Sequence, residues 1–210
     1  MIDDKKVIIV GNSPSILSEE YGSLIDSYDI VIRLNKCATK GFEKHTGSKT
    51  DIWASTHHKY YPDFLPTDYK NIKEIWRRTP SVKMILPEDF PEYNNLIMFK
   101  TKDFKFKSVI SGLSHEPCTG LLAILTSTLF YKDITIVGFT FYTESNGFVT
   151  GYYRDSELEN DKTHKEDIYW KENKDSGFAG EDVAIVKQKI IGKLVEDNLI
   201  KILNTNKKEK

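Results

Sequence analysis

Two short polar segments of this chain each follow an apolar run and carry side chains suited to ligand binding. Gly11-Asn12-Ser13 comes directly after Val7–Val10, and Asn35 ends the next apolar run. Asparagine and serine hold a base, a ribose hydroxyl or a phosphate oxygen, and glycine lets backbone amides approach a ligand closely. These residues therefore favour a nucleotide or sugar site. Asn12 and Ser13 taken alone are equally well explained as the cap of a following helix.

The first polar segment matches neither of two well-known phosphate-binding patterns. It lacks the Gly-x-Gly-x-x-Gly spacing of dinucleotide sites and the Gly-Lys-Ser/Thr ending of a P-loop. Arg33, two residues before Asn35, is a candidate phosphate ligand, and its alternative role is a buried pairing with a helix carboxylate. The ligand therefore has to be identified from the longer pattern around these residues.

The elements that would position these side chains alternate between strands and helices. Apolar runs predict strands at 7–10, 30–32, 51–54, 82–86, 134–138 and 200–203. The apolar residues at 121–130 and the helical spacing at 181–197 predict two helices. This alternation predicts a Rossmann-like, doubly wound, mostly parallel α/β sheet in a single domain. In such a sheet the polar ends of neighbouring strands meet at one edge, where ligands bind.

Composition narrows the class of protein and its partners. Hydrophobic residues make up 39% and charged residues 29%, which is typical of a soluble globular protein. The net charge of -1 argues against nucleic acid as a partner. Residues 1–10 resemble neither a signal peptide nor a membrane span, so we expect no transmembrane anchor, at most peripheral membrane contact, and a cytoplasmic location. We expect the catalytic domain to span 1–205, followed by a basic tail at 206–210.

The polar residues belong to two longer motifs. VGNSPSIL, YGSLIDSYDIVIRLNK and GFEKHTGSKTD follow one another in the first quarter of the chain, and PCTGLL precedes IVGF later on. In order and spacing, these stretches resemble the large and small sialylmotifs of the eukaryotic-type sialyltransferases, glycosyltransferase family 29. The resemblance implies the GT-A-variant sialyltransferase fold. It also implies an inverting transfer of sialic acid, or a related keto-acid sugar, from a CMP-sugar donor to a glycan hydroxyl.

The resemblance also implies roles for individual residues. Asn12, Ser13 and Asn35 would bind the CMP part of the donor, and Thr119 and Gly120 would hold the cytidine and sugar from the other side. A helix N-terminus, where the last two stand, presents free amides to an acceptor-rich ligand. Thr119-Gly120 can alternatively serve only as a helix cap.

The family resemblance implies that no metal and no cofactor are needed, because hydroxyl groups stabilise the leaving phosphate. Candidates for that role are Ser55, Thr56, Tyr142, Tyr152 and Tyr153. The tyrosines lie in or just before the long polar segment 143–180, which we expect to act as a lid. Their alternative role is to pack the lid. The segment Asp26-Ser27-Tyr28-Asp29 looks like a metal-binding Asp-x-Asp, but in the family it is structural.

A general base must take the proton of the acceptor hydroxyl, and histidine suits this role because its pKa lies near neutrality. The family uses a histidine shortly before the last helix. His164 is the only histidine after the small motif, but it lies farther from that helix. Glu181 or Asp182, close to where the family histidine falls, is the alternative base.

Two departures from the family pattern affect the prediction. Val7 and Tyr131 stand where the family has a disulfide, and the two cysteines, Cys37 and Cys118, lie elsewhere. Their thiols fit a reducing compartment and a short bacterial- or viral-like enzyme. Two alternatives stay open. One is a CMP-Kdo-dependent transferase, and the other is a catalytically idle nucleotide- or glycan-binding module of the same fold.

Overall fold

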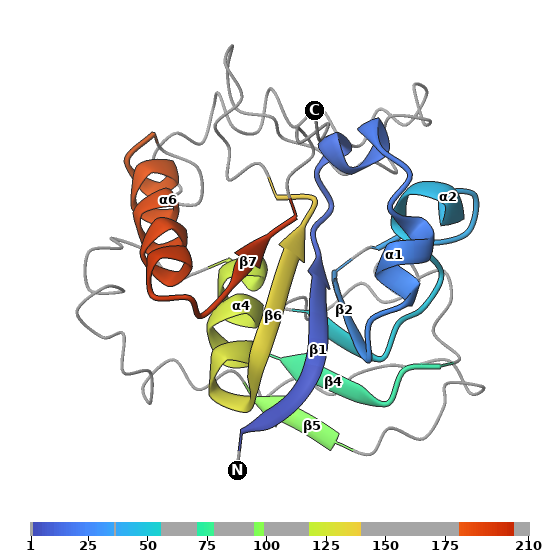
Figure 1. The fold of residues 1–210 in the computed structure, drawn as a ribbon, viewed down its shortest axis with the longest axis horizontal. Coiled ribbons are helices and arrows are strands. Elements are labelled where there is room, and N and C mark those ends of the chain that lie inside the picture. Colours follow the sequence, from blue (N-terminus) through green and yellow to red (C-terminus); the bar gives the residue numbers. More distant parts are fainter. Residues whose placement is uncertain are drawn as a thin grey trace.

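The computed structural model describes residues 2–35, 37–55, 71–77, 95–98, 118–139 and 181–203 (Figure 1). Its strands are β1 (Asp3–Val10), β2 (Ile30–Leu34), β3 (Ile52–Ser55), β4 (Glu74–Arg77), β5 (Asn95–Met98), β6 (Tyr131–Val137) and β7 (Lys201–Ile202). Its helices are the 3-10 helix η1 (Pro14–Ser18), α1 (Gly22–Asp26), α2 (Glu43–Thr46), α4 (Thr119–Phe130) and α6 (Glu181–Glu196).

The strands form one parallel sheet in the order β5-β4-β3-β2-β1-β6-β7. The chain starts at β1, moves outward through β2 to β5, and returns to the other side of β1 as β6 (Figure 1). The order therefore reverses between β1 and β6. In open α/β sheets, ligands bind outside the carboxyl ends of the strands at such a reversal.

Helices cover both faces of the sheet, so the predicted doubly wound α/β fold is confirmed. On one face, α4 and α6 pack against alternate residues of the strands, such as Val7 and Ile9 of β1. On the other face, Ile16 of η1 and Ile25 of α1 pack against Ile8 and Val10 of the same strand. Both sets of β1 side chains are buried, as expected for a central parallel strand.

Most of the predicted elements are present with small shifts of their ends. The strands expected at 7–10, 30–32, 51–54, 134–138 and 200–203 correspond to β1, β2, β3, β6 and β7, and the two expected helices to α4 and α6. The sequence did not predict β4, β5 or the short helices η1, α1 and α2. The strand expected at 82–86, the lid expected at 143–180 and the tail at 206–210 lie outside the described residues. No described helix has the length and hydrophobicity needed to cross a membrane.

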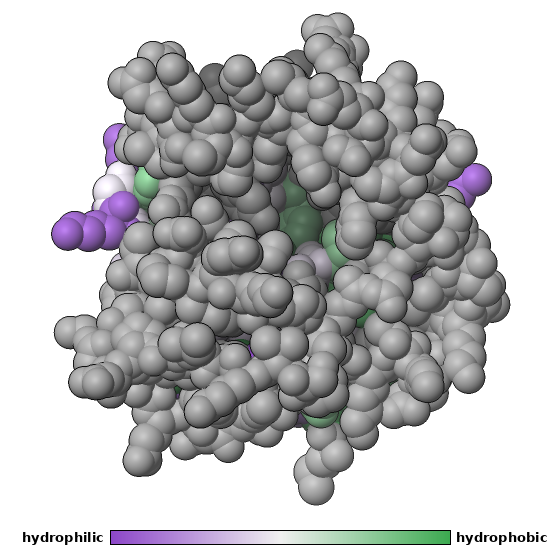
Figure 2. Space-filling model, turned by 180° about the vertical axis from the view of Figure 1, so that it is seen from behind, coloured by the Kyte–Doolittle hydropathy of each residue, from purple (hydrophilic) through white to green (hydrophobic). Residues whose placement is uncertain are grey.

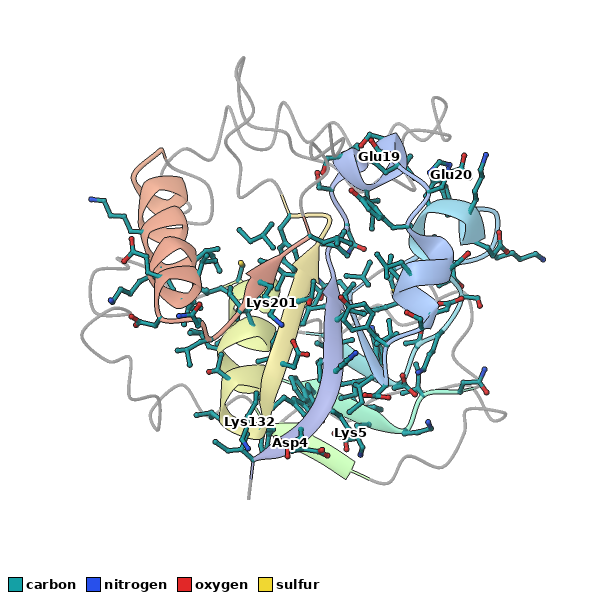
Figure 3. All side chains as sticks on the ribbon, in the orientation of Figure 1. Asp4, Lys5, Glu19, Glu20, Lys132 and Lys201 are labelled. Carbon is teal, nitrogen blue, oxygen red and sulfur yellow. The ribbon has the colours of Figure 1, made fainter. Side chains whose placement is uncertain are left out.

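Charged side chains are paired at both ends of the strands. At the amino end of β1, Lys132 Nζ lies 2.8 Å from the Asp4 carboxylate, and the two side chains point toward each other (Figure 3). Near η1, Lys44 Nζ lies 2.7 Å from Glu20. All four side chains are exposed, so each pair contributes about 0–1 kcal/mol to stability. Seen from behind, apolar described residues come into view near the centre of the molecule (Figure 2).

Candidate functional site

The carboxyl ends of β1 and β6 meet so closely that only backbone fits between them. The Gly11 amide donates to the Val137 carbonyl at 2.8 Å, and the Ser13 amide donates to the Gly138 carbonyl at 3.1 Å. A Cβ atom on Gly11 would overlap the Gly138 carbonyl oxygen. Gly138 itself has a φ of 71°, which glycine adopts without strain. The contact between the ends of β1 and β6 is therefore made by backbone alone. The amides of Gly11 and Ser13 donate their hydrogen bonds to carbonyls of the protein.

Asn12 links the end of β1 to the end of β2. Its Nδ2 donates to the Leu34 carbonyl at 2.8 Å, which fixes the orientation of the side-chain amide. Its Oδ1 is buried and has no hydrogen-bond partner among the described residues. A buried polar atom without a partner is costly, and functional sites are where such atoms are retained. Asn12 thus presents an acceptor, which suits a hydroxyl or amino group of a ligand.

Asn35 has a left-handed backbone conformation, with a φ of 47°. Asparagine tolerates this region better than most residues. Two hydrogen bonds hold the backbone there: the Asn35 amide donates to the Ala54 carbonyl at 2.9 Å, and Trp53 Nε1 donates to the Asn35 carbonyl at 2.9 Å. The end of β2 is thereby tied to β3, and Asn35 leaves the sheet beside Asn12.

Ser13 acts as the N-cap of η1. Its Oγ accepts a hydrogen bond from the Ser15 amide at 3.3 Å and another from the Ser15 hydroxyl at 3.1 Å. Capping was one of the two roles that the sequence left open for this residue. The hydrogen bond from the Ser15 amide is long, so the helix that Ser13 caps holds its hydroxyl only loosely.

The N-terminus of α4 lies against the same edge of the sheet. A Cβ atom on Gly120 would lie 3.0 Å from the Phe139 ring and 3.4 Å from Leu34 Cδ1, so the first turn of α4 approaches the ends of β2 and β6. The N-cap residue, Cys118, makes no side-chain capping bond. The structure thus brings Asn12, Asn35 and the start of α4 to one edge, where amides and amide oxygens converge.

Arg33 is fully buried, and its contacts differ from both roles that the sequence suggested. Its Nε donates to the Lys49 carbonyl at 2.9 Å and to Thr50 Oγ1 at 3.0 Å, and its Nη2 donates to the Thr46 carbonyl at 2.7 Å. Its described partners are thus carbonyls and a hydroxyl, with no carboxylate among them. Arg33 fixes the loop after α2 to β2.

The aspartates of the Asp-x-Asp-like segment accept hydrogen bonds from other groups of the protein. The Asp26 carboxylate accepts hydrogen bonds from the Ser48 amide, the Ser48 hydroxyl and the Lys49 amide at 2.9–3.0 Å. Asp29 accepts from the Lys6 amide at 2.8 Å. Among the residues that the structure describes, no group of three or more His, Cys, Asp or Glu side chains is placed to hold a metal ion.

Several predicted site residues lie outside the described part of the chain. These are Thr56, Tyr142, Tyr152, Tyr153 and His164. Glu181 and Asp182 are the first residues of α6. Cys37 is buried and Cys118 is half-buried, and no disulfide joins the two.

Sequence reasoning missed Arg77, the last residue of β4. It is 4% exposed and pairs in register with Ser55 at the end of β3. The Ser55 hydroxyl is buried, with no hydrogen-bond partner among the described residues. The available signal was the Trp76-Arg77 pair, an apolar residue followed by a charge at the end of a short run.

Comparisons with known proteins point to one glycosyltransferase family. The model of glycosyltransferase family 29 (sialyltransferase) matches residues 4–106. The CMP-N-acetylneuraminate-beta-galactosamide-alpha-2,3-sialyltransferase 1 of Sus scrofa is 26% identical over 163 residues, covering 66% of this chain and 45% of that protein. The CMP-N-acetylneuraminate-beta-1,4-galactoside alpha-2,3-sialyltransferase of Rattus norvegicus is 54% identical over 182 residues, covering 71% and 48%. The chain thus spans about half the length of these relatives.

A solved structure shares the fold. The crystal structure of a mammalian sialyltransferase in complex with Gal-beta-1-3GalNAc-ortho-nitrophenol matches with a TM-score of 0.61 and 20% sequence identity. The match covers 95% of this chain and 69% of that chain. At this identity the likeness concerns the fold alone.

Proposed function

Because this chain belongs to glycosyltransferase family 29, we propose that it transfers a sialic acid from a CMP-linked donor to a glycan hydroxyl, with inversion at the anomeric carbon. The single observation that carries the proposal is the buried Oδ1 of Asn12 at the reversal between β1 and β6, which has no hydrogen-bond partner among the described residues. This is the place where the fold class binds ligands, and the atom accepts the kind of hydrogen bond that a nucleoside donates.

In the proposed complex, the nucleotide lies across the ends of β1 and β2. Asn12 Oδ1 accepts from a ribose hydroxyl or from the amino group of cytosine, while its Nδ2 stays on the Leu34 carbonyl. The N-terminus of α4 stands beside this edge and favours negative charge, because its first amides point outward without partners in the helix. The negative charge that this N-terminus would stabilise is the phosphate of CMP.

The chemical step is a direct displacement. The acceptor oxygen bonds to the anomeric carbon of the sugar as the bond from that carbon to the phosphate oxygen breaks, and CMP leaves with both electrons of that bond. The proton of the acceptor hydroxyl passes to a general base, for which His164, Glu181 and Asp182 remain the candidates. We propose that the phosphate leaves without a metal ion.

One incubation tests the function. The full chain is mixed with CMP-N-acetylneuraminate and an oligosaccharide ending in galactose, with and without excess EDTA, and free CMP and sialylated product are measured. We expect product in both samples. Activity lost in EDTA and restored by magnesium or manganese would contradict the metal-free step. Tight CMP binding without release of CMP or product would favour the idle binding module.

The same assay with CMP-Kdo separates the two donor sugars. Both are keto-acid sugars linked to CMP, and the residues around Asn12 face the nucleotide that the two donors share. A faster reaction with CMP-Kdo would assign this chain to the alternative donor while leaving the nucleotide site unchanged.

A further inference from the structure

The Phe139 ring lies between two segments that meet at the candidate site, the turn after β1 and the first turn of α4. A Cβ atom on Gly11 would lie 3.0 Å from Cδ2 of this ring, and a Cβ atom on Gly120 would lie 3.0 Å from its Cε1. These two carbons stand at opposite corners of the six-membered ring. The turn after β1 and the start of α4 therefore contact opposite edges of one side chain.

Backbone hydrogen bonds fix the point from which this side chain extends. The Val137 carbonyl accepts from the Gly11 amide at 2.8 Å, and the Gly138 carbonyl accepts from the Ser13 amide at 3.1 Å. Phe139 follows directly, is half-buried, and packs against the core on the face of the sheet that α4 covers. The residue is thus held to the end of β1 through its neighbours, and the far edge of its ring meets α4.

Glycine at position 120 allows the ring and the helix to approach this closely. Glycine is a weaker helix former than alanine, so this position carries a cost to α4. A methyl group 3.0 Å from a ring carbon would be nearer than the contact optimum of about 3.5–4.0 Å. Alanine would therefore push the ring and the helix apart, whereas glycine lets the ring edge determine where α4 begins.

The two segments that the ring separates would bind different ends of the proposed ligand. Asn12 directly follows Gly11, and its buried Oδ1 has no hydrogen-bond partner among the described residues. In α4, the Leu122 amide donates to the Cys118 carbonyl at 3.0 Å, and the amides before Leu122 have no partner within the helix. Those amides favour a negative charge. The ring therefore sets the distance from an acceptor for the nucleoside to the amides that favour a phosphate.

We propose that Phe139 is a positioning residue, whose ring sets the spacing between the nucleoside half and the phosphate half of the donor site. This inference rests on the proposed function, because it takes CMP to lie across Asn12 and the start of α4. A nucleotide joins its nucleoside to its phosphate at a limited range of separations. A change in the spacing of the two half-sites therefore weakens the joined ligand and spares a ligand that occupies only one of them.

Titration calorimetry of the full chain with CMP and with cytidine tests this role. Phe139→Leu removes the ring edge that meets Gly120, and should weaken CMP binding by roughly 2- to 10-fold, the usual worth of a helix N-terminus to an anion. Cytidine has no phosphate, so its affinity should stay unchanged. Phe130→Leu is the matched control, because it makes the same substitution at the last residue of α4, where the ring packs against Trp76. It should alter neither affinity.

Gly120→Ala probes the same contact from the helix and keeps the test valid if Phe139→Leu folds poorly. Its methyl group meets the ring, so CMP should again bind roughly 2- to 10-fold more weakly while cytidine affinity stays unchanged. In the double variant, the shorter leucine leaves room for that methyl group. The double variant should therefore bind CMP more tightly than Gly120→Ala does, which is the non-additivity expected of residues in contact.

Three results would overturn the inference. Unchanged CMP affinity in both single variants removes the spacing role, and so does an equal weakening of CMP and cytidine. Losses that simply add in the double variant show that the contact between the ring and α4 is not their cause. If the unaltered chain binds neither probe, the proposed function itself fails, and this outcome is distinct because it appears before any substitution is made.

Discussion

The indole nitrogen of Trp53 donates a hydrogen bond to the main-chain carbonyl of Asn35, with 2.9 Å between the two atoms. The Trp53 ring is fully buried, while Asn35 stands at the edge of the sheet beside Asn12. The hydrogen bond connects the core of the sheet to the backbone that leaves β2 in a left-handed conformation. Trp53 therefore positions Asn35 without itself reaching the edge.

Trp53→Phe should weaken CMP binding by roughly 3- to 10-fold, because the Asn35 carbonyl loses its donor while the aromatic volume is largely kept. Calorimetric titration with CMP measures this. The matched control is Trp76→Phe, since Trp76 is equally buried and its Nε1 donates to Glu74 Oε2 at 3.2 Å. That variant should lose stability but keep its CMP affinity. Equal CMP affinities in both variants would contradict a positioning role for Trp53.

Asn12 offers a sharper test, because its two side-chain atoms have different roles. Asn12→Ala removes both, and should weaken CMP binding by about 1–3 kcal/mol. Asn12→Asp keeps an acceptor but cannot donate to the Leu34 carbonyl, so it should also lower the free energy of unfolding. Urea denaturation and CMP titration measure the two effects. A folded Asn12→Ala protein that binds CMP as tightly as the unaltered chain would remove the nucleotide site from this edge.

The general base can be assigned by kinetics. His164→Ala should lower kcat by roughly two to four orders of magnitude, the usual worth of general-base catalysis, while CMP affinity stays unchanged. Near-normal turnover in His164→Ala, together with a large loss in Glu181→Gln or Asp182→Asn, would move the base to the carboxylate. Activity in all three variants would exclude every candidate.

Tyr131 makes the stability of the folded state depend on pH in the alkaline range. Burial, together with the negative charges of Glu74 and Asp3, raises the pKa of the Tyr131 phenol to about 12. An unfolded tyrosine has a pKa near 10, so the folded state holds this proton more tightly. The stabilisation is therefore complete below about pH 10 and is lost as the pH rises toward 12. The melting temperature of the unaltered chain should therefore fall relative to that of Tyr131→Phe over that window, and parallel curves would contradict it.

The central part of the fold could be predicted because its strands are buried on both faces. Val7–Val10 and Ile30–Ile32 are continuous apolar runs, which is what a central parallel strand requires. β4 was missed because Glu74 and Arg77 flank only two apolar residues, Ile75 and Trp76, and so no run is visible. Helices of four or five residues are too short to show a helical period, so η1, α1 and α2 were missed as well.

The same reasoning explains how much of the site was foreseen. Asn12 and Asn35 directly follow recognisable strands, and parallel pairing then places them side by side. Arg77 could not be placed without β4, so its pairing with Ser55 emerged only from the register of the sheet. The opposite roles of the two Asn12 side-chain atoms depend on one contact with a carbonyl from another strand, which no sequence pattern encodes.

The contact between Gly11 and Gly138 has a consequence for redesign. Because no side chain fits between these two backbones, the ends of β1 and β6 cannot be reshaped by substitution at either position. A library aimed at a different nucleotide or sugar acid should therefore leave both glycines fixed. Its diversity belongs at Asn12 and Asn35, whose side chains lie beside the nucleotide in the proposed function.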